Sequence, residues 1–161
     1  MNKKEIHLSY EEYASAQELP APDAFLVSRA REVTKDAYAP YSRFRVGAAA
    51  RLTNGEVITG TNQENASYPV GICAERTLLS VAGALFPNVA IETLAVAYDN
   101  GLGTSDRPIS PCGLCRQSLQ EFEQRTDRPI RIILAGQTGK VLILEGSKIL
   151  LPFAFTSDEL K

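Results

Sequence analysis

The three cysteines of this chain stand in two short motifs that lie far apart in the sequence. Cys73 opens the stretch "CAER", and Cys112 and Cys115 stand in the stretch "PCGLC". Each motif begins a predicted helix that follows a strand-like run. Cys112 and Cys115 are three positions apart, which places both thiols on one face of a helical turn. Because both helices follow strands of one predicted sheet, we expect their starts to meet at one edge of that sheet, where all three sulfurs can reach one site.

Apolar periodicity along the rest of the chain predicts the layers around that sheet. Helices are predicted over about 24–38, after Asp23 as a plausible N-cap, and over about 73–85, 112–124 and 147–151. The strand-like runs are "FRVGAAARL", "EVITGTN", "IETLAVAY", "IRIILAG" and "VLILEG". Because helices alternate with buried strands, this order predicts an α/β fold, a three-layer α/β/α domain around a mixed sheet of five strands.

Two short connections predict antiparallel pairs within this sheet. The pair Asn54-Gly55 joins the first two strands and favours the left-handed backbone of a tight hairpin turn. Only the stretch around Gln137 to Lys140 separates the last two strands. Since a parallel pair needs a crossover of about a dozen residues or more, we expect the last two strands to be antiparallel.

The chain divides into a polar N-terminal extension, 1–22, and one compact domain, 23–161. A length of 161 residues with 44% hydrophobic content suits a single domain with a sizeable core. In the extension, Ser9 and Glu12 have the spacing of a capping box, which predicts a short surface helix.

Charge and hydropathy exclude several classes of partner. The chain carries 17 basic and 19 acidic residues, so it lacks the cationic field that collects a nucleic acid or a lipid surface. No apolar run resembles a signal peptide or is long enough for a membrane span. We therefore expect a soluble, cytoplasmic protein that acts on a small molecule and binds neither nucleic acid nor membranes.

The cysteine motifs predict a zinc site with Cys73, Cys112 and Cys115 as ligands. Three protein ligands leave the fourth tetrahedral position for water, which is the arrangement of a catalytic site. Glu75, on the first turn of its helix, is placed to move a proton of that water. Three thiolates leave excess negative charge on the site, and the guanidinium of Arg76 could withdraw part of it.

Other interpretations of the cysteines remain open from the residues alone. Cys112 and Cys115 could form a redox pair in a reducing compartment. A structural zinc site could be closed by His7, the only histidine. The three cysteines could also be unrelated core residues. The redox and structural interpretations give Glu75 no role.

Several stretches together resemble the zinc-dependent cytidine deaminases of the small homotetrameric type. They are "YAPYSRFRVGAA", "GTNQENASY", "CAER", "SPCGLCRQ" and "LLPFAF", and they cover the chain from about Asp23 to the C-terminus. The resemblance implies one Zn²⁺ per chain and hydrolysis of cytidine and 2′-deoxycytidine to uridine and 2′-deoxyuridine with release of ammonia, a step of pyrimidine salvage. Zinc-activated hydroxide would attack the base, and Glu75 would shuttle the protons.

The resemblance also implies roles for residues that the motif spacing leaves unassigned. Phe44 would pack on the pyrimidine, and Asn62 and Glu64 would bind the ribose hydroxyls. The backbone N–H of Ala74 and the carbonyl of Ser110 would hold the base.

Two further residues match positions that family members contribute across subunit interfaces. These are Tyr68 and Phe155, so the resemblance implies a homotetramer whose active sites are completed by neighbouring subunits. Phe153 stands where many relatives have a small residue, which leaves open whether Phe153 or Phe155 reaches the neighbouring site.

Two related classes of deaminase share part of this pattern. Deaminases of the nucleoside antibiotic blasticidin S have "CAE" and a similar second motif, but "NQENASY" is the ribose-binding pattern of the nucleoside enzymes. Polynucleotide-editing deaminases have parallel final strands, which the short connection at 137–140 does not allow.

Overall fold

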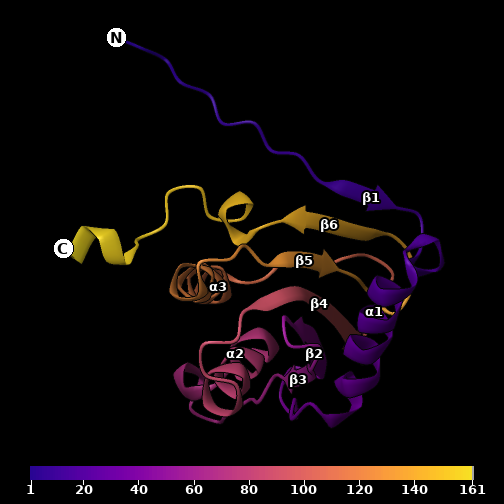
Figure 1. Ribbon diagram of the computed structural model, residues 1–161. Helices are drawn as coiled ribbons and strands as arrows, with labels where there is room; N and C mark the ends of the chain where they lie inside the picture. The colour runs from indigo at the N-terminus through magenta and orange to yellow at the C-terminus, as the bar shows by residue number, and fades with distance from the viewer. Residues whose placement is uncertain (161) are drawn as a thin grey trace.

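The computed structural model describes residues 1–160, so Lys161, the last residue of the predicted domain, lies outside the described residues. Within this range the middle layer is one mixed sheet with strand order β1-β6-β5-β4-β2-β3 (Figure 1). Its strands are β1 (Glu11–Tyr13), β2 (Phe44–Leu52), β3 (Val57–Thr61), β4 (Ile91–Asn100), β5 (Arg131–Leu134) and β6 (Val141–Glu145). Short 3₁₀ helices connect the larger elements: η1 (Ala16–Glu18), η2 (Thr34–Asp36), η3 (Tyr68–Val70), η4 (Ser147–Ile149) and η5 (Ser157–Leu160).

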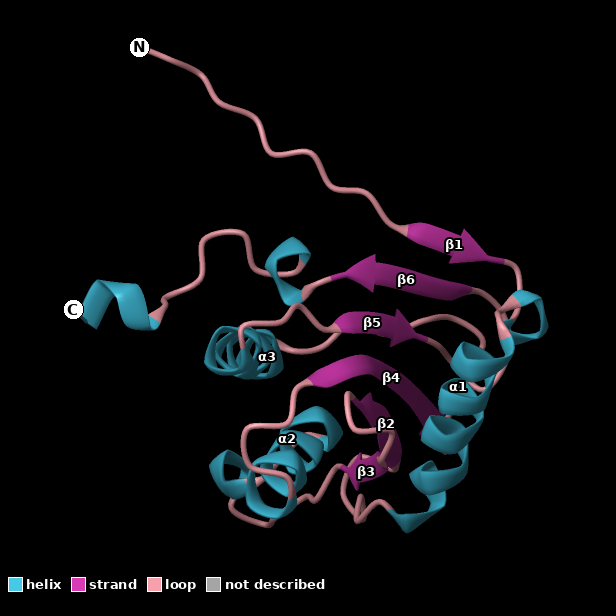
Figure 2. Ribbon diagram, viewed as in Figure 1, coloured by secondary structure: helices cyan, strands magenta, loops and turns pink. Residues whose placement is uncertain are grey.

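Three α-helices cover the two faces of the sheet. Helix α1 (Ala21–Val33) lies on one face, and α2 (Ala74–Leu85) and α3 (Gly113–Thr126) lie on the other (Figure 2). Two apolar clusters fill the spaces between these layers, one containing Leu26 of α1 and one containing Leu78 of α2 and Leu119 of α3. The predicted three-layer α/β/α arrangement is therefore confirmed.

The sheet has six strands in the described residues, so the predicted number of five is wrong. The additional strand is β1, whose residues pair antiparallel with Val141 to Ile143 of β6. The structure thus has a strand where the capping box of Ser9 and Glu12 predicts a helix, and the helical turn of the extension is η1. The capping-box pattern is local, whereas the exposed edge of β6 offers backbone partners that only the folded sheet presents.

The predicted antiparallel pairs are both present. β2 pairs antiparallel with β3, and Gly55 in the turn between them has φ 89°, a backbone conformation that glycine adopts without strain. β5 and β6 are also antiparallel, while β4 and β5 are parallel across α3. The short connection between the last two strands therefore predicted their direction correctly.

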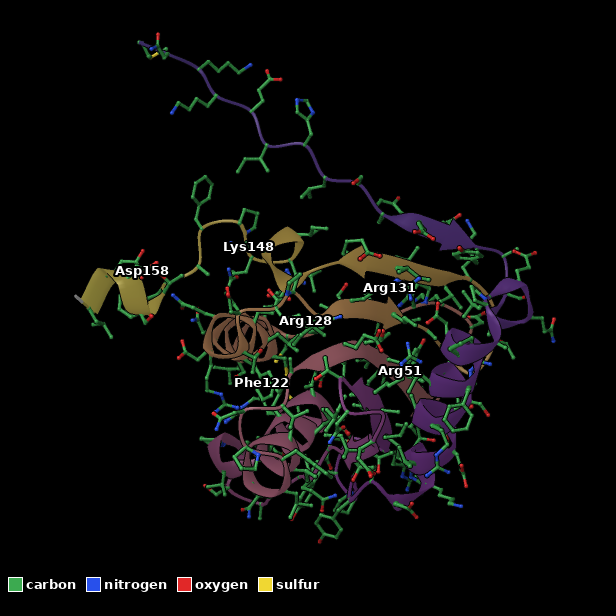
Figure 3. The ribbon with its side chains drawn as sticks, in the orientation of Figure 1. Arg51, Phe122, Arg128, Arg131, Lys148 and Asp158 are labelled. Atoms are coloured by element: carbon green, nitrogen blue, oxygen red, sulfur yellow. The ribbon has the colours of Figure 1, made fainter. Side chains whose placement is uncertain are left out.

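Helix α1 begins earlier than the predicted N-cap. Its N-cap is Pro20, and the carboxylate of Asp23, inside the first turn, accepts a hydrogen bond from Arg131 Nη1 at 2.7 Å. Arg131 is labelled on its strand in Figure 3. Asp23 is buried, so this ion pair ties α1 to the start of β5. A long-range partner has replaced the local capping role that the sequence favours for an aspartate.

Helix α2 packs unusually close to β3 because Gly60 has no side chain. A Cβ atom at Gly60 would lie 2.5 Å from the backbone nitrogen of Leu78 and 2.6 Å from the carbonyl oxygen of Ala74. This close approach fixes the position of the first turn of α2.

No helix among the described residues is long and apolar enough to cross a membrane.

Candidate active site

The three cysteine sulfurs meet at the starts of α2 and α3. Cys73 is the N-cap of α2, Cys112 is the N-cap of α3, and Cys115 lies buried in the first turn of α3. The sulfur of Cys112 is 3.7 Å from that of Cys73 and 3.5 Å from that of Cys115, and all three sulfurs lie within 4.8 Å of one another. The predicted convergence of the two motifs is confirmed.

Strand direction explains why the two helix starts meet. β3 and β4 both run antiparallel to β2, which lies between them, so β3 and β4 point the same way. Each is followed by one of the two helices, and both helices therefore begin at the same end of the sheet. Phe44, the first residue of β2, also lies at this end, opposite Asn100 of β4.

The cysteine cluster fits a zinc ion. With Zn–S distances of about 2.3 Å, tetrahedral geometry separates two ligand sulfurs by about 3.8 Å, close to the observed spacings. Thiolates are the soft ligands that zinc prefers, and the cluster offers three of them. Cys73, Cys112 and Cys115 would hold the metal, which leaves one tetrahedral position for a small ligand.

The thiols of the cluster shift one another's pKa values. A hydrogen bond with Cys115 lowers the pKa of Cys73 to about 6, and the Cys112 thiol and the charge of Arg76 act in the same direction, against burial. The hydrogen bond to Cys73 and burial raise the pKa of Cys115. The thiols thus share protons through their mutual contacts, and binding of a divalent cation would displace those protons.

Glu75 lies beside this cluster on the first turn of α2. Its side chain is 5% exposed, and burial raises the pKa of the carboxyl, partly offset by a hydrogen bond from its own backbone N–H and by one with Cys115. A raised pKa makes the carboxyl a stronger base than an ordinary glutamate, which suits a group that accepts and then donates a proton. The structure brings Glu75 and the three cysteines together as the spacing predicts.

Two arginines adjoin the cysteines, and they act differently. Within residues 1–160 no hydrogen bond joins the guanidinium of Arg76 to a cysteine sulfur, and its charge is the last of the influences that lower the pKa of Cys73. Arg116 was not among the predicted site residues. Its Nε donates to the carbonyl oxygen of Pro111 at 2.8 Å, and its Nη1 donates to that of Leu150 at 3.0 Å. Arg116 therefore fixes the chain just before Cys112, and its place directly after the last ligand is the signal that could have identified it.

A cavity of about 510 Å³ adjoins the cysteine cluster. It is open to solvent, and Asn62, Glu64, Tyr68 and Cys73 line it. The loop that carries the first three of these is held to the chain before Cys73, since Gln63 exchanges two backbone hydrogen bonds with Ile72. Three of the predicted substrate-binding residues and one metal ligand therefore share one cavity.

Hydrogen bonds hold Asn62 to the start of β2 and Glu64 to the loop just before it. Asn62 Oδ1 accepts from the N–H of Val46 at 2.7 Å, and its Nδ2 donates to the carbonyl oxygen of Phe44 at 2.9 Å. Glu64 Oε2 accepts from the N–H of Tyr41 at 2.9 Å and its Oε1 from the hydroxyl of Ser42. Burial raises the pKa of Glu64, but these hydrogen bonds lower it by a larger amount. The pKa of the carboxyl therefore lies below its ordinary value.

The remaining predicted contacts of the base lie at the same end of the sheet. Phe44 is half-buried and stacks on Tyr98, with ring centroids 4.9 Å apart. Ala74 is buried in the first turn of α2, where backbone N–H groups have no partner within the helix. Ser110 is exposed and lies two residues before Cys112.

The aromatic residues predicted to reach across subunits are exposed. Tyr68 is 76% exposed and touches Tyr41 edge-to-face, with ring centroids 6.1 Å apart. Phe155 is 59% exposed, and Gln117 of α3 donates a hydrogen bond to its carbonyl oxygen at 2.7 Å. Phe153 is 89% exposed. Phe155 is thus held against α3 by its backbone and is not a lining residue of the Cys73 cavity in the described chain.

Comparison with known families agrees with this geometry. Residues 21–128 match the family described as the cytidine and deoxycytidylate deaminase zinc-binding region. The matched range contains the three cysteines and Glu75. Together with the α/β/α fold and the metal-fitting cluster, this match defines a zinc-dependent hydrolytic deaminase.

Individual relatives narrow the class further. The cytidine deaminase of Halalkalibacterium halodurans is 37% identical over 135 residues, which cover 84% of this chain and 95% of the relative. The cytidine deaminase of Mycobacterium tuberculosis is 39% identical over 138 residues, or 84% of this chain and 90% of the relative. The crystal structure of cytidine deaminase from Burkholderia pseudomallei superimposes with a TM-score of 0.71 at 37% identity, covering 81% of this chain and 97% of that one. The chain belongs to the cytidine deaminase family.

Proposed function

We propose that this protein hydrolyses cytidine and 2′-deoxycytidine to uridine and 2′-deoxyuridine with release of ammonia. The observation that carries the proposal is the buried carboxyl of Glu75 beside three metal-fitting cysteines, next to a cavity whose lining includes Asn62 and Glu64. Relatives named as cytidine deaminases cover most of the chain and support this substrate.

The polar groups of the cavity suit a free nucleoside. Glu64 offers a carboxylate whose lowered pKa keeps it ionised at neutral pH, so it can accept a hydrogen bond from a ribose hydroxyl. The same charge repels a phosphate on that hydroxyl, which favours a nucleoside over a nucleotide or a polynucleotide. Asn62 keeps one N–H of its amide available for the sugar, because Nδ2 carries two hydrogens and the carbonyl of Phe44 accepts one.

Three groups then hold the base. The half-buried ring of Phe44 packs on the pyrimidine, while the N–H of Ala74 donates to the base O2 and the carbonyl of Ser110 accepts from the amino group. These contacts direct C4 of the base toward the cysteines.

Proton transfer falls to Glu75. Cys73, Cys112 and Cys115 would hold one zinc ion per chain, which would supply a water molecule of lowered pKa as the nucleophile for C4. Glu75 takes a proton from that water and delivers it to N3. It then takes the second proton from the oxygen that has added to C4 and delivers it to the departing amine. Water is consumed, ammonia leaves, and Glu75 returns to its starting state.

We also infer that the protein is a cytoplasmic homotetramer that serves pyrimidine salvage. The exposure of Tyr68 and Phe155 supports a role at subunit interfaces, where they would complete the active sites of neighbours. Of the two terminal phenylalanines we favour Phe155, because Gln117 anchors its backbone on α3.

Substitution of Glu75 tests the reaction. We expect Glu75→Gln to bind zinc like the wild type and to lower the turnover of cytidine by about 10²–10⁴-fold, the usual contribution of a general acid and base. Metal content is measured by elemental analysis and turnover by the loss of cytidine absorbance. Glu121→Gln is the matched control, because Glu121 is an exposed carboxylate of α3 outside the cavity. Wild-type-like turnover by Glu75→Gln would contradict the assigned role, and a wild-type enzyme inert toward both nucleosides would contradict the proposed function.

A further inference from the structure

Ser42 lies between the residues proposed to hold the ribose and the residue proposed to hold the base. Its hydroxyl donates a hydrogen bond to Glu64 Oε1. The Oγ of Ser42 in turn accepts a hydrogen bond from the backbone N–H of Phe44 at 3.0 Å. One hydroxyl group thus connects the carboxylate of Glu64 to the start of β2.

The connection from Phe44 to the ribose-binding residues has a second branch. While the N–H of Phe44 bonds to Ser42, its carbonyl oxygen accepts from Asn62 Nδ2 at 2.9 Å. Both peptide groups of Phe44 are therefore engaged by Asn62 and, through Ser42, by Glu64. The three residues proposed to contact sugar and base form one hydrogen-bonded unit, in which the Ser42 hydroxyl bridges Glu64 and Phe44.

The backbone around Ser42 is held in an unusual conformation. Arg43 has φ 55°, in the left-handed region that costs energy for a residue with a side chain. Its N–H donates to the carbonyl of Ala39 at 3.1 Å, and its carbonyl accepts from Gly101 at 3.0 Å. These bonds hold the turn in a shape that directs Ser42 and Phe44 to the same carboxylate-bearing loop.

Ser42 determines which way the Glu64 carboxylate can point. Glu64 Oε2 already accepts from the backbone N–H groups of Tyr41 at 2.9 Å and Ser42 at 3.3 Å. With these two bonds alone, the carboxylate could still pivot about Oε2. The hydrogen bond from the Ser42 hydroxyl to Oε1 prevents this rotation. With two bonds on Oε2 and one on Oε1, the carboxylate keeps one of its about four acceptor positions, on Oε1, and Glu64 lines the cavity beside Cys73.

We propose that Ser42 is a positioning residue for nucleoside recognition, which orients Glu64 to accept a hydrogen bond from the 3′-hydroxyl of the ribose. The inference rests on the proposed function and adds a positioning residue to it. It follows that the effect of losing the Ser42 hydroxyl depends on whether the substrate carries a 3′-hydroxyl. A serine with a purely structural role would affect all cytosine nucleosides equally.

Kinetics with a pair of substrates test this dependence. Cytidine and 3′-deoxycytidine are compared for the wild type and for Ser42→Ala, Ser42→Thr and Ser42→Val. Thr and Val have nearly the same shape, and only Thr retains the hydroxyl. We expect kcat/KM for cytidine to fall about tenfold in the Ala and Val variants, mainly through KM, as for one hydrogen bond to a charged group. For 3′-deoxycytidine we expect less than a twofold change, and Thr should restore the preference for cytidine. Ser118→Ala is the matched control, because the exposed Ser118 hydroxyl bonds only to the carbonyl of Leu114.

The outcomes separate this proposal from the proposed function. A wild-type enzyme that does not deaminate cytidine overturns both. An active wild type whose Ala and Val variants lose the same factor on both substrates, or lose nothing, overturns the role of Ser42 alone. If Ser42→Ala does not fold, the comparison of Thr with Val decides, since equal substrate ratios in these two variants also overturn the proposal.

Discussion

Replacing Gly60 by alanine should disturb the metal site without touching a ligand. A Cβ at this position would lie 2.5 Å from the nitrogen of Leu78, 2.6 Å from the carbonyl oxygen of Ala74 and 2.9 Å from the Cα of Leu78. All three are backbone atoms of α2, so no side-chain rotation can relieve the contact. An ordinary contact begins near 3.4 Å, so the first half of α2 must move away from β3 by about 0.9 Å.

A movement of this size is large for a metal site. Cys73 is the N-cap of α2, and its sulfur lies 3.7 Å from that of Cys112 on a different helix. Ligand distances in a working site vary by only about 0.2 Å, so a displaced Cys73 should weaken zinc binding. Glu75 moves with the same turn, and a misplacement of about 1 Å can lower the rate of catalysis by about 10²-fold. Overpacking should also lower the free energy of unfolding by about 1–3 kcal/mol.

The assay compares Gly60→Ala with a second glycine of the same helix. Gly83→Ala is the control, because its Cβ would meet only the guanidinium nitrogens of Arg125, at 3.5 and 3.8 Å. Alanine is favoured over glycine in a helix by about 1 kcal/mol, so Gly83→Ala should keep its activity and become slightly more stable. Zinc content, the midpoint of denaturant unfolding and cytidine turnover are measured for both. If Gly60→Ala retains full zinc and turnover within twofold of the wild type, the argument that Gly60 fixes the position of Cys73 is refuted.

Two further predictions concern other parts of the molecule. Glu123 is buried and accepts hydrogen bonds from the N–H groups of Ile130 and Ser147 and from the Ser147 hydroxyl, at 2.8, 2.7 and 2.7 Å. Glu123→Ala leaves these donors without a partner and should destabilise the protein by about 3 kcal/mol, measured by urea denaturation; a loss below about 1 kcal/mol would contradict this. Light scattering should give the mass of four chains, and Phe155→Ala should lower kcat/KM about tenfold while changing the stability of the chain by less than about 0.5 kcal/mol. Unchanged kinetics would show that Phe155 does not complete a neighbouring site.

Local patterns along the chain predicted the centre of the site. The spacing of Cys112 and Cys115 depends only on helical geometry, and the place of Cys73 and Glu75 at a helix start depends on neighbours along the chain. The alternation of helices and buried strands was enough to predict that both helix starts meet at one edge, and the sulfur cluster confirms it. The short connection between β5 and β6 predicted their antiparallel pairing, because a few residues cannot form the crossover that a parallel pair of strands needs.

Contacts between segments far apart in the sequence decided the rest. β1 forms because the edge of β6 offers it backbone partners, although the local pattern at Ser9 favours a helix. Asp23 pairs with Arg131 across more than half of the chain, where the local pattern favours a helix cap. The link from Ser42 to Glu64 likewise appears only when two loops come together. A sequence by itself determines which ligands and helix starts a short segment can supply, because these depend on bond geometry along the chain. The tertiary structure decides which hydrogen-bond partners each side chain meets, because those partners are brought near only by folding.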